Sequence, residues 1–491
     1  MTLTTRIAII LVFFLGTTLW LLSYEKKLSL FKKPLSQLEQ IKKTGTLKVV
    51  TRIDPTTYYQ GPSGFMGLEY ELVTLFAKQL GVKAQFSTPD TFTEILQQIT
   101  SGNTDIAAAG LTITKPRQKT IHFAPTYQEI TEQIIYRSGT KRPEKATDLS
   151  QGILEVVKDT SHIESLKKLH KQAPKLTWEI NNNLDTDGLI YLVNKGLIDY
   201  TVADSNQIAL IRRFYPELQT GFSISKPRHL AWGLTRSNDT SLSDEVTSFF
   251  NRIKQDKTLD QLIERYYGHS LSLSYVDLCK FREHVSNRLP TFQNFFQEAA
   301  EEYNMDWRLL AAIGYQESHW LKNAVSPTGV QGLMMLTQNT ANQLGIKDRA
   351  DPTESIMGGT KYFQQSIKKI PERIPDPDRT WMALAAYNIG FGHLEDARIL
   401  TQKQAGDPDK WLEVKKSLPL LTQKKWYKQT KHGHSKGNKP VEYVENIRSY
   451  YDLLVWLTEE NQIEKNVMSV KKQLVKTVVP IQASTLKAVA Q

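Results

Sequence analysis

The chain has 491 residues, 40% hydrophobic and 23% charged, an ordinary composition for folded protein and too long for one hydrophobic core, so we expect at least two domains. Lys and Arg number 62 against 51 Asp and Glu, and the formal charge of +11 suits a polyanionic partner; without a basic stripe interleaved with aromatic residues, it does not predict nucleic-acid binding. The single cysteine, Cys279, excludes an intrachain disulfide and a cysteine-based zinc site.

The N-terminus carries an uncharged, mostly apolar run over 7–22, between Arg6 and Lys26. A basic start followed by such a run is typical of export, so we predict that residues 1–24 are a signal sequence or an N-terminal anchor. The run is short for a membrane span, which needs about 20 apolar residues, and no convincing cleavage site follows it. Cleavage and retention both stay open. After a Lys-rich linker over 25–43, the rest of the chain is expected outside the cytoplasmic membrane.

Short strands and helices alternate over the next part of the chain. Strands are predicted over 47–51, 84–86 and 105–109, and helices over 68–80 and 92–99. This spacing indicates βαβ units and a mainly parallel sheet. A second α/β stretch has strands over 153–157 and 199–203 and a helix over 161–170, before the chain returns to the first lobe near 231–234. We therefore predict a two-lobed α/β domain over 44–269.

Strand signals vanish in the second half, and helical patterns continue to about residue 457. We predict a mainly α domain over 270–457 and a loosely ordered tail over 458–491. One of its helices is expected over 306–320, with Asp306 as its cap.

Glu317 lies near the end of that helix. Leu310 and Ile313 precede it by seven and four positions, so the carboxylate ends an apolar stripe. Desolvation there would raise the pKa of Glu317 and keep it protonated near neutral pH, as a general acid for a glycosidic oxygen requires. Taken alone, the helix favours a simpler interpretation, in which Glu317 is the first exposed residue of a fraying end.

Four motifs together favour Glu317 as a general acid over Glu317 as an exposed helix end. They occur in the order Glu317-Ser318, Gly332-Leu333-Met334, Ala386-Tyr387-Asn388 and Tyr443 close to Asn446-Ile447. The second motif belongs to a Gly-punctuated loop that is predicted to enter a methionine-bearing helix. A lone Glu-Ser pair would carry no information. The four together resemble the lysozyme-like family of soluble-type lytic transglycosylases.

The resemblance implies the chemistry of the site. Glu317 matches the only catalytic residue of the family, which protonates the oxygen between N-acetylmuramic acid and N-acetylglucosamine. It then deprotonates the muramoyl 6-hydroxyl, which attacks its own anomeric carbon and leaves a 1,6-anhydromuramoyl end. The N-acetyl group of the substrate stabilises the cationic centre, so no second carboxylate is needed. No cofactor and no metal are implied.

The resemblance also implies a set of residues that bind the substrate by lining the glycan groove, or that orient Glu317, and these are Ser326, Met334, Tyr387, Asn388 and Tyr443. By their residue types alone, Met334 would be a core filler and Asn388 a turn former. One departure stands out, because the family often has Gln after Gly-Leu-Met and this chain has Met335. A polar contact to the sugar N-acetyl group is then lost or supplied elsewhere.

The α/β half resembles periplasmic solute-binding proteins for amino acids, on motifs at 67–72, 102–105, 111–117 and 123–127. The resemblance implies that Arg117 clamps a ligand carboxylate with paired hydrogen bonds, that Thr112 donates beside it and that Asp204 holds an amino group. The ligand would be an amino acid or a cell-wall peptide. A scaffold that binds nothing is the alternative. The hinge between the lobes is expected near 136–137.

The two domains in this order, with the Met-Met variant, are similar to the F subgroup of membrane-bound lytic transglycosylases. This implies a membrane-associated periplasmic enzyme on peptidoglycan glycan strands, peripheral on the outer membrane, or anchored in the inner membrane if the signal is retained. A glycan- and peptide-binding sensor without catalysis is one alternative. A lysozyme-type hydrolase is another, with Glu445 or Asp396 as a second carboxylate. His432 and His434 alone make a poor metal site.

Overall fold

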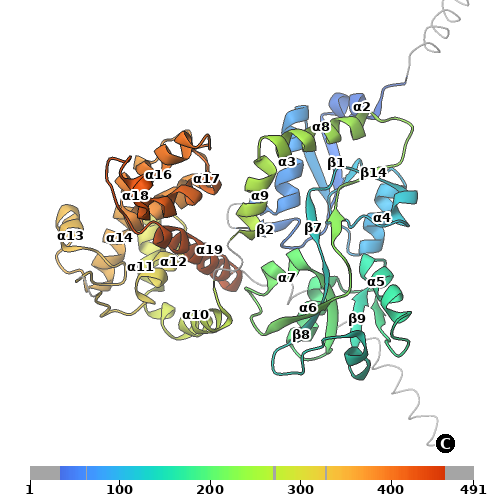
Figure 1. The fold of residues 1–491 in the computed structure, drawn as a ribbon, viewed down its shortest axis with the longest axis horizontal. Helices are drawn as coiled ribbons and strands as arrows, with labels where there is room; N and C mark the ends of the chain where they lie inside the picture. The colour runs from blue at the N-terminus through green and yellow to red at the C-terminus, as the bar shows by residue number, and fades with distance from the viewer. Residues whose placement is uncertain (1–33, 62–63, 269–272, 327–328, 459–491) are drawn as a thin grey trace, which may run out of the picture.

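The computed structural model describes residues 34–61, 64–268, 273–326 and 329–458. The predicted signal over 1–24, much of the linker and nearly all of the predicted tail lie outside these residues. Figure 1 shows two α/β lobes, one above the other, beside a helical part. Within the described ranges, no helix is both long and apolar enough to cross a membrane.

The first lobe is built on a five-stranded sheet in the order β4-β1-β5-β14-β6. Its strands are β1 (Thr46–Val50), β4 (Lys83–Ser87), β5 (Ile106–Ala107), β6 (Ile121–Phe123) and β14 (Gly233–Thr235). Its helices are α2 (Gln37–Thr44), α3 (Leu68–Leu80), α4 (Phe92–Thr100), α8 (Ser241–Gln255) and α9 (Thr258–Tyr267). β1 runs parallel to β4 and β5, whereas β14 runs antiparallel to β5 and β6. The strands β4, β1, β5 and β6 all run in the same direction and β14 alone is reversed, so the expectation of a mainly parallel sheet is confirmed.

The second lobe repeats this plan in the order β10-β9-β11-β8-β12. Its strands are β8 (Glu132–Arg137), β9 (Leu154–Val157), β10 (Glu179–Asn181), β11 (Tyr200–Asp204) and β12 (Leu218–Ser223). Its helices are α5 (Ser161–His170), α6 (Thr186–Asn194) and α7 (Ser205–Ile211). Here β8 is antiparallel to β11 and β12, because the chain enters this lobe along β8 before the βαβ units begin.

The lobes are joined by the antiparallel pair β7 (Gln128–Ile130) and β13 (Arg228–Leu230), and Figure 1 shows β7 running from one lobe to the other. The sequence placed the hinge near 136–137, and this was wrong. Tyr136 and Arg137 lie inside β8, where they pair with β12, and a ladder on that side leaves them little freedom to act as a hinge.

The helical part runs from α10 to α19, and the described residues contain no named strand after β14. Its main helices are α10 (Tyr275–Asn287), α11 (Gln293–Tyr303), α12 (Trp307–Ser318), α13 (Gln338–Leu344), α14 (Pro352–Lys369), α15 (Asp378–Ile389), α16 (Phe391–Lys403), α17 (Trp411–Ser417), α18 (Lys424–Tyr427) and α19 (Asn438–Thr458). α12 and α15 both pack on α19, and residues of all three helices share one buried cluster.

Helix α19 also contacts both lobes. Near its middle, Arg448 Nη1 lies 3.0 Å from Glu264 Oε1 of α9, and Lys415 Nζ lies 2.7 Å from the same oxygen. Near its end, the ring of Trp456 stacks on Phe214 of the second lobe, with centroids 5.2 Å apart. Helix α19 therefore contributes to the contacts of the helical part with both lobes.

Glu264 is the centre of this contact, and its substitution tests it. Burial alone would raise the pKa of Glu264, but Arg448 and Lys415 outweigh burial and hold it below its usual 4.5. We expect Glu264→Gln to lower the free energy of unfolding at pH 7 by about 3 kcal/mol, because it leaves Glu445 alone to balance the charges of Arg448 and Lys415. A carboxyl group whose pKa is lower in the folded than in the unfolded protein stabilises the fold at pH values above its unfolded pKa. This stabilisation is lost as the pH falls through its folded pKa. The difference in unfolding free energy between wild type and Glu264→Gln should therefore shrink as the pH falls below 4.5.

Urea unfolding followed by tryptophan fluorescence between pH 3 and 7 (roughly the range in which carboxylates titrate) measures this difference. Glu413→Gln is the matched control, because Glu413 also faces the α/β part, 3.9 Å from the exposed Lys257. An exposed pair of that length contributes less than about 1 kcal/mol. Equal losses from both substitutions would contradict the assignment.

Candidate active site

Glu317 sits in the last turn of α12. The helix starts at the predicted cap, where the Asp306 carboxylate accepts a 2.9 Å hydrogen bond from the backbone N–H of Arg308. It ends because His319 adopts a left-handed conformation with φ of 50°. The predicted helix over 306–320 is thus confirmed apart from its ends, and the Glu317 carboxylate lies at the edge of the buried core.

The carboxylate of Glu317 has one hydrogen-bond partner from a distant part of the chain. Tyr443 Oη, on α19, donates to Glu317 Oε1 at 2.6 Å, and Tyr443 is itself buried. Burial raises the pKa of Glu317 to about 7, and the bond from Tyr443 opposes that rise. At neutral pH the group is therefore divided between its acid and its carboxylate forms.

The Gly-Leu-Met loop is fastened beside this carboxylate by three side chains. Ser318 Oγ donates to the carbonyl of Leu333 at 2.9 Å, and Tyr387 Oη donates to the carbonyl of Met334 at 2.9 Å. The backbone N–H of Met334 donates to Ser355 Oγ at 3.1 Å. The loop is therefore tied to α12, α14 and α15 through its backbone.

Met334 was predicted to line the substrate site, and the structure places its side chain in the core instead. It is fully buried between Gly314 of α12 and Gly359 of α14, and a Cβ added at Gly359 would lie 2.4 Å from Met334 Cβ. The helix expected at the methionines is also absent from this described loop, because Met335 takes a left-handed φ of 46° and α13 begins only at Gln338.

The other two predicted contacts lie at the surface of the helical part. Ser326 shapes the loop, since its Oγ accepts a 3.0 Å hydrogen bond from the backbone N–H of Val330. Asn388 is exposed in the last turn of α15, one residue after Tyr387. The described residues thus bring Glu317, Tyr443 and Tyr387 together, whereas Ser326 and Asn388 stand on exposed turns.

Asp396 and Glu445, the two candidates for the second carboxylate of a hydrolase, both have other hydrogen-bond partners. Asp396 accepts hydrogen bonds from the backbone N–H groups of Lys431 and His432, at 3.1 and 2.9 Å. Glu445 accepts a 3.1 Å bond from Lys415 Nζ in the contact with the first lobe. Both side chains therefore have structural partners, and neither is among the groups that shift the pKa of Glu317.

Sequence reasoning missed two residues of this site. Ser355 is fully buried and holds the loop through Met334, and the ring of Tyr362 lies 5.2 Å from that of Tyr387. Both belong to α14, whose Gly358-Gly359 pair allows the close approach of the loop. The Gly-Gly pair inside a predicted helix was the sequence signal for this contact. Glycine weakens a helix, so its presence there indicates that another chain segment packs closely against it.

In the α/β part, the predicted ligand clamp bridges the two lobes. Arg117 is buried, and its guanidinium donates to the carbonyl of Thr112 in the first lobe and to that of Asp159 in the second, both at 3.0 Å. Thr114 Oγ1 also crosses, donating to Glu164 Oε1 at 2.9 Å. Desolvation lowers the pKa of Arg117 to about 10, which leaves it charged at neutral pH. The lobes therefore meet closely at this point.

Asp204 and Thr112 are buried on opposite sides of the same junction. Asp204 Oδ1 lies 3.1 Å from His162 Nε2, and Thr112 forms a β-bridge with Leu230 near the hinge. A small cavity of about 130 Å³ also lies between the lobes, where Arg52 of the first lobe and Asp185 of the second are among its lining residues. The three predicted ligand contacts are not among those lining residues.

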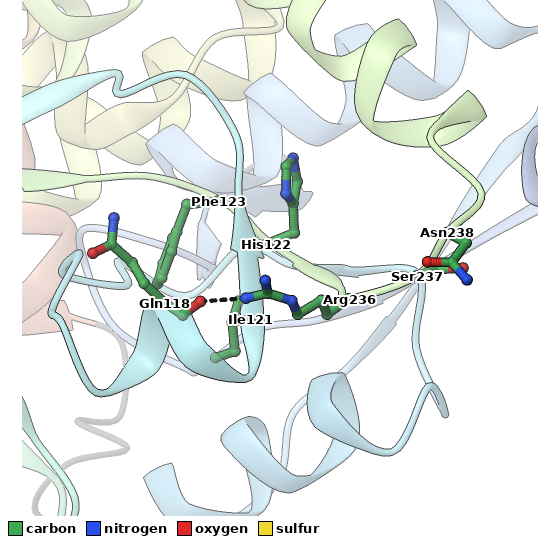
Figure 2. Close-up of a pocket in the computed structure, with 7 residues that line it drawn as sticks. All are labelled: Gln118, Ile121, His122, Phe123, Arg236, Ser237 and Asn238. Carbon is green, nitrogen blue, oxygen red and sulfur yellow. Dashed lines mark hydrogen bonds between the residues drawn. The ribbon is translucent and has the colours of Figure 1, made fainter.

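A larger hollow, of about 680 Å³, lies on the outside of the first lobe next to the edge strand β6. Figure 2 shows Arg236 reaching Gln118 across it, where Arg236 Nη1 donates to the carbonyl of Gln118 at 2.7 Å. None of the residues predicted to bind or to react lines this hollow.

Two family models match the chain. Residues 39–269 match the bacterial extracellular solute-binding proteins, family 3, and residues 294–410 match the transglycosylase SLT domain. Among solved structures, a mutant of ArgBP from T. maritima aligns with 47% of this chain and 99% of its own, with 21% identity and a TM-score of 0.43. The fold, the carboxylate site and these models define a class of protein in which a solute-binding-like domain precedes a lytic transglycosylase domain.

Whole-chain relatives make the assignment more specific. Membrane-bound lytic murein transglycosylase F 1 of Alkalilimnicola ehrlichii is 46% identical over 87% of this chain and 87% of its own. Membrane-bound lytic murein transglycosylase F of Saccharophagus degradans is 45% identical over 87% of this chain and 85% of its own. This chain belongs to the membrane-bound lytic murein transglycosylase F family.

The ionisation of Glu317 can be measured directly. We expect a pKa of about 7 from a ¹³C NMR titration of glutamate-labelled protein, with the resonance assigned by its loss in Glu317→Gln. Tyr443→Phe should raise this pKa further, because it removes the hydrogen bond that favours the carboxylate. Tyr450→Phe is the control, since Tyr450 lies on the same helix and stacks on Phe281. A wild-type pKa near 4.5, the ordinary value, would contradict the burial of this carboxyl group.

Proposed function

We propose that this protein cleaves the glycan strands of peptidoglycan as a lytic transglycosylase, with Glu317 as its single catalytic acid and base. The observation that carries the proposal is a carboxyl group whose pKa burial raises to about 7, bonded to Tyr443. A group with that pKa can both give and take a proton near neutral pH, which is what one residue serving two steps requires.

In the first step, protonated Glu317 gives its proton to the oxygen between N-acetylmuramic acid and N-acetylglucosamine, and the glycosidic bond breaks. In the second, the Glu317 carboxylate takes the proton of the muramoyl 6-hydroxyl as that oxygen bonds to the anomeric carbon. The N-acetyl group of the substrate shares the positive charge between the steps. No water is consumed, and Glu317 ends protonated as it began.

Tyr443 would assist by its hydrogen bond, which is stronger to the carboxylate than to the acid and so orients Glu317 for the second step. Tyr387 would line the groove beside it and hold the loop through Met334. We propose that Ser326 and Asn388 contact the glycan from their exposed turns, and that Met334 contributes its packing rather than a sugar contact.

The two alternatives fit these contacts less well. A hydrolase of lysozyme type would place a second carboxylate near the anomeric carbon, and Asp396 and Glu445 are held by other groups. A sensor that grips glycan without cutting it would have no need for a carboxyl group with a pKa near 7.

For the α/β domain we propose an amino acid or a cell-wall peptide as ligand, with Arg117 on its carboxylate, Thr112 beside it and Asp204 on its amino group. Binding would replace the backbone contacts that Arg117 makes across the lobes. Because α19 touches both lobes and carries Tyr443, a ligand that prefers one lobe arrangement would bias the active site.

We further propose that 44–269 and 270–457 act as the ligand-binding and catalytic units. The relatives are named as membrane-bound murein enzymes, which supports a place in the periplasm. We propose peripheral attachment to the outer membrane, or anchoring in the inner membrane by an uncleaved N-terminal segment.

The reaction is tested by mass spectrometry of soluble products from purified sacculi. We expect muropeptides with anhydro ends, lighter by the mass of one water than reducing-end forms, and at least about a hundredfold slower release by Glu317→Gln. Asp396→Asn and Glu445→Gln test the alternative carboxylates and should keep the anhydro product. Products with reducing ends would indicate a hydrolase. If the wild type bound sacculi but released no muropeptides, the result would favour the non-catalytic sensor.

Ligand binding is tested by calorimetry of the full chain with free amino acids and with a peptidoglycan stem peptide. We expect Arg117→Gln to weaken binding at least about tenfold, because it removes a charged hydrogen bond to the ligand. Arg236→Gln is the matched control, since Arg236 is an arginine of the same lobe that lines the outer hollow. Equal affinity of wild type and Arg117→Gln would overturn the assigned clamp, and no heat with any of these ligands would favour the scaffold.

A further inference from the structure

A buried cluster in the second lobe has no role in glycan cleavage. Glu132 begins β8 and Asp204 ends β11, and they are direct partners in the antiparallel ladder. Like charges placed opposite each other destabilise a sheet unless something lies between them. His162, in the first turn of α5, brings Nε2 to 3.1 Å from Asp204 Oδ1.

The spacing of the three side chains suits a metal ion. One ligand atom from each of Glu132, His162 and Asp204 lies within 4.8 Å of the other two. In a tetrahedral zinc site, bonds of about 2.1 Å put neighbouring ligand atoms roughly 3.4 Å apart. The His162–Asp204 separation of 3.1 Å is close to that value, and a small rotation of Glu132 would complete the set.

Glu132 supplies the independent sign that something is bound here. It is fully buried, yet neither of its carboxylate oxygens has a hydrogen-bond partner among the described residues. Arg228 Nη1 lies 3.4 Å from Oε1, too far for a good hydrogen bond, while Arg228 Nη2 donates to Ser165 Oγ at 2.7 Å. A buried carboxylate without hydrogen bonds is costly, so its lone pairs call for a ligand.

We propose that Glu132, His162 and Asp204 bind a divalent transition-metal ion of the Zn²⁺ type. An imidazole nitrogen among the ligands favours such an ion over Ca²⁺ or Mg²⁺, which prefer oxygen throughout. The ion would offset the repulsion of the two opposed carboxylates. Three protein ligands leave one position of a tetrahedron open, so the ion would also accept a donor from a small molecule between the lobes.

A simpler arrangement competes with this one. Protonated His162 would pair with Asp204, and Arg228 with Glu132, so that the charges balance without an ion. That arrangement leaves the lone pairs of Glu132 unfilled, whereas a metal ion fills them. A bound ion would replace the direct contact between Asp204 and the ligand amino group that is proposed above. Glycan cleavage does not depend on this site, and its failure would leave that proposal untouched.

The test is a Zn²⁺ titration of the purified full chain, stripped with chelator and measured by calorimetry against a competing chelator of known affinity. We expect one ion per chain, and binding at least about tenfold weaker in Glu132→Gln and in His162→Gln. Glu164→Gln is the matched control. Glu164 lies on the same helix as His162, and its substitution removes the same charge as Glu132→Gln, but Glu164 offers no ligand atom to the cluster.

Co²⁺ gives a second readout that a general loss of stability does not mimic. We expect visible d–d absorption from Co²⁺ bound to the wild type, lost in His162→Gln while circular dichroism shows the variant to be folded. Three results would each overturn the proposal: no Zn²⁺ bound by the wild type, equal weakening by Glu164→Gln, or unchanged binding in both ligand variants, which would place the ion elsewhere.

Discussion

The hydrogen bond between Tyr443 and Glu317 is the contact on which the catalytic half depends. It joins α12 to α19, helices that lie 126 positions apart in sequence at these two residues. Burial raises the pKa of this carboxyl group, and the hydrogen bond donated from α19 limits that rise. The balance of these two effects leaves Glu317 near neutrality, where a single residue can serve as acid and then as base.

The rest of the site is organised by backbone rather than by side-chain chemistry. Ser318, Ser355 and Tyr387 all bond to the main chain of the loop, so these three contacts do not depend on the loop's own side chains. Glycines on α12 and α14 give Met334 room to enter the core, which anchors the loop from inside. None of these three contacts involves Met335.

The α/β half is held closed by polar contacts that cross between its lobes. Arg117 donates to backbone carbonyls on both sides, and Thr114 reaches Glu164. Each of these hydrogen bonds contributes little net free energy, because water can replace it. A ligand carboxylate that displaces them therefore loses only a modest amount of binding free energy. The contact of α19 with both lobes means that the two halves of the protein share one rigid element, whose middle bears Arg448 and whose end bears Trp456.

Periodicity and short motifs are local properties of the chain, and they were enough to predict the two-part architecture, Glu317, and three helices and five strands of the α/β half. The predicted helices over 161–170 and 68–80 are confirmed to the residue. Contacts between distant segments were needed to show that Met334 lies in the core, that β7 and β13 join the lobes, and that Tyr443 bonds to Glu317. Such contacts were also needed to show that Glu132 faces Asp204, since strand pairing and burial arise between segments far apart in the chain, and no local pattern records which of them will meet.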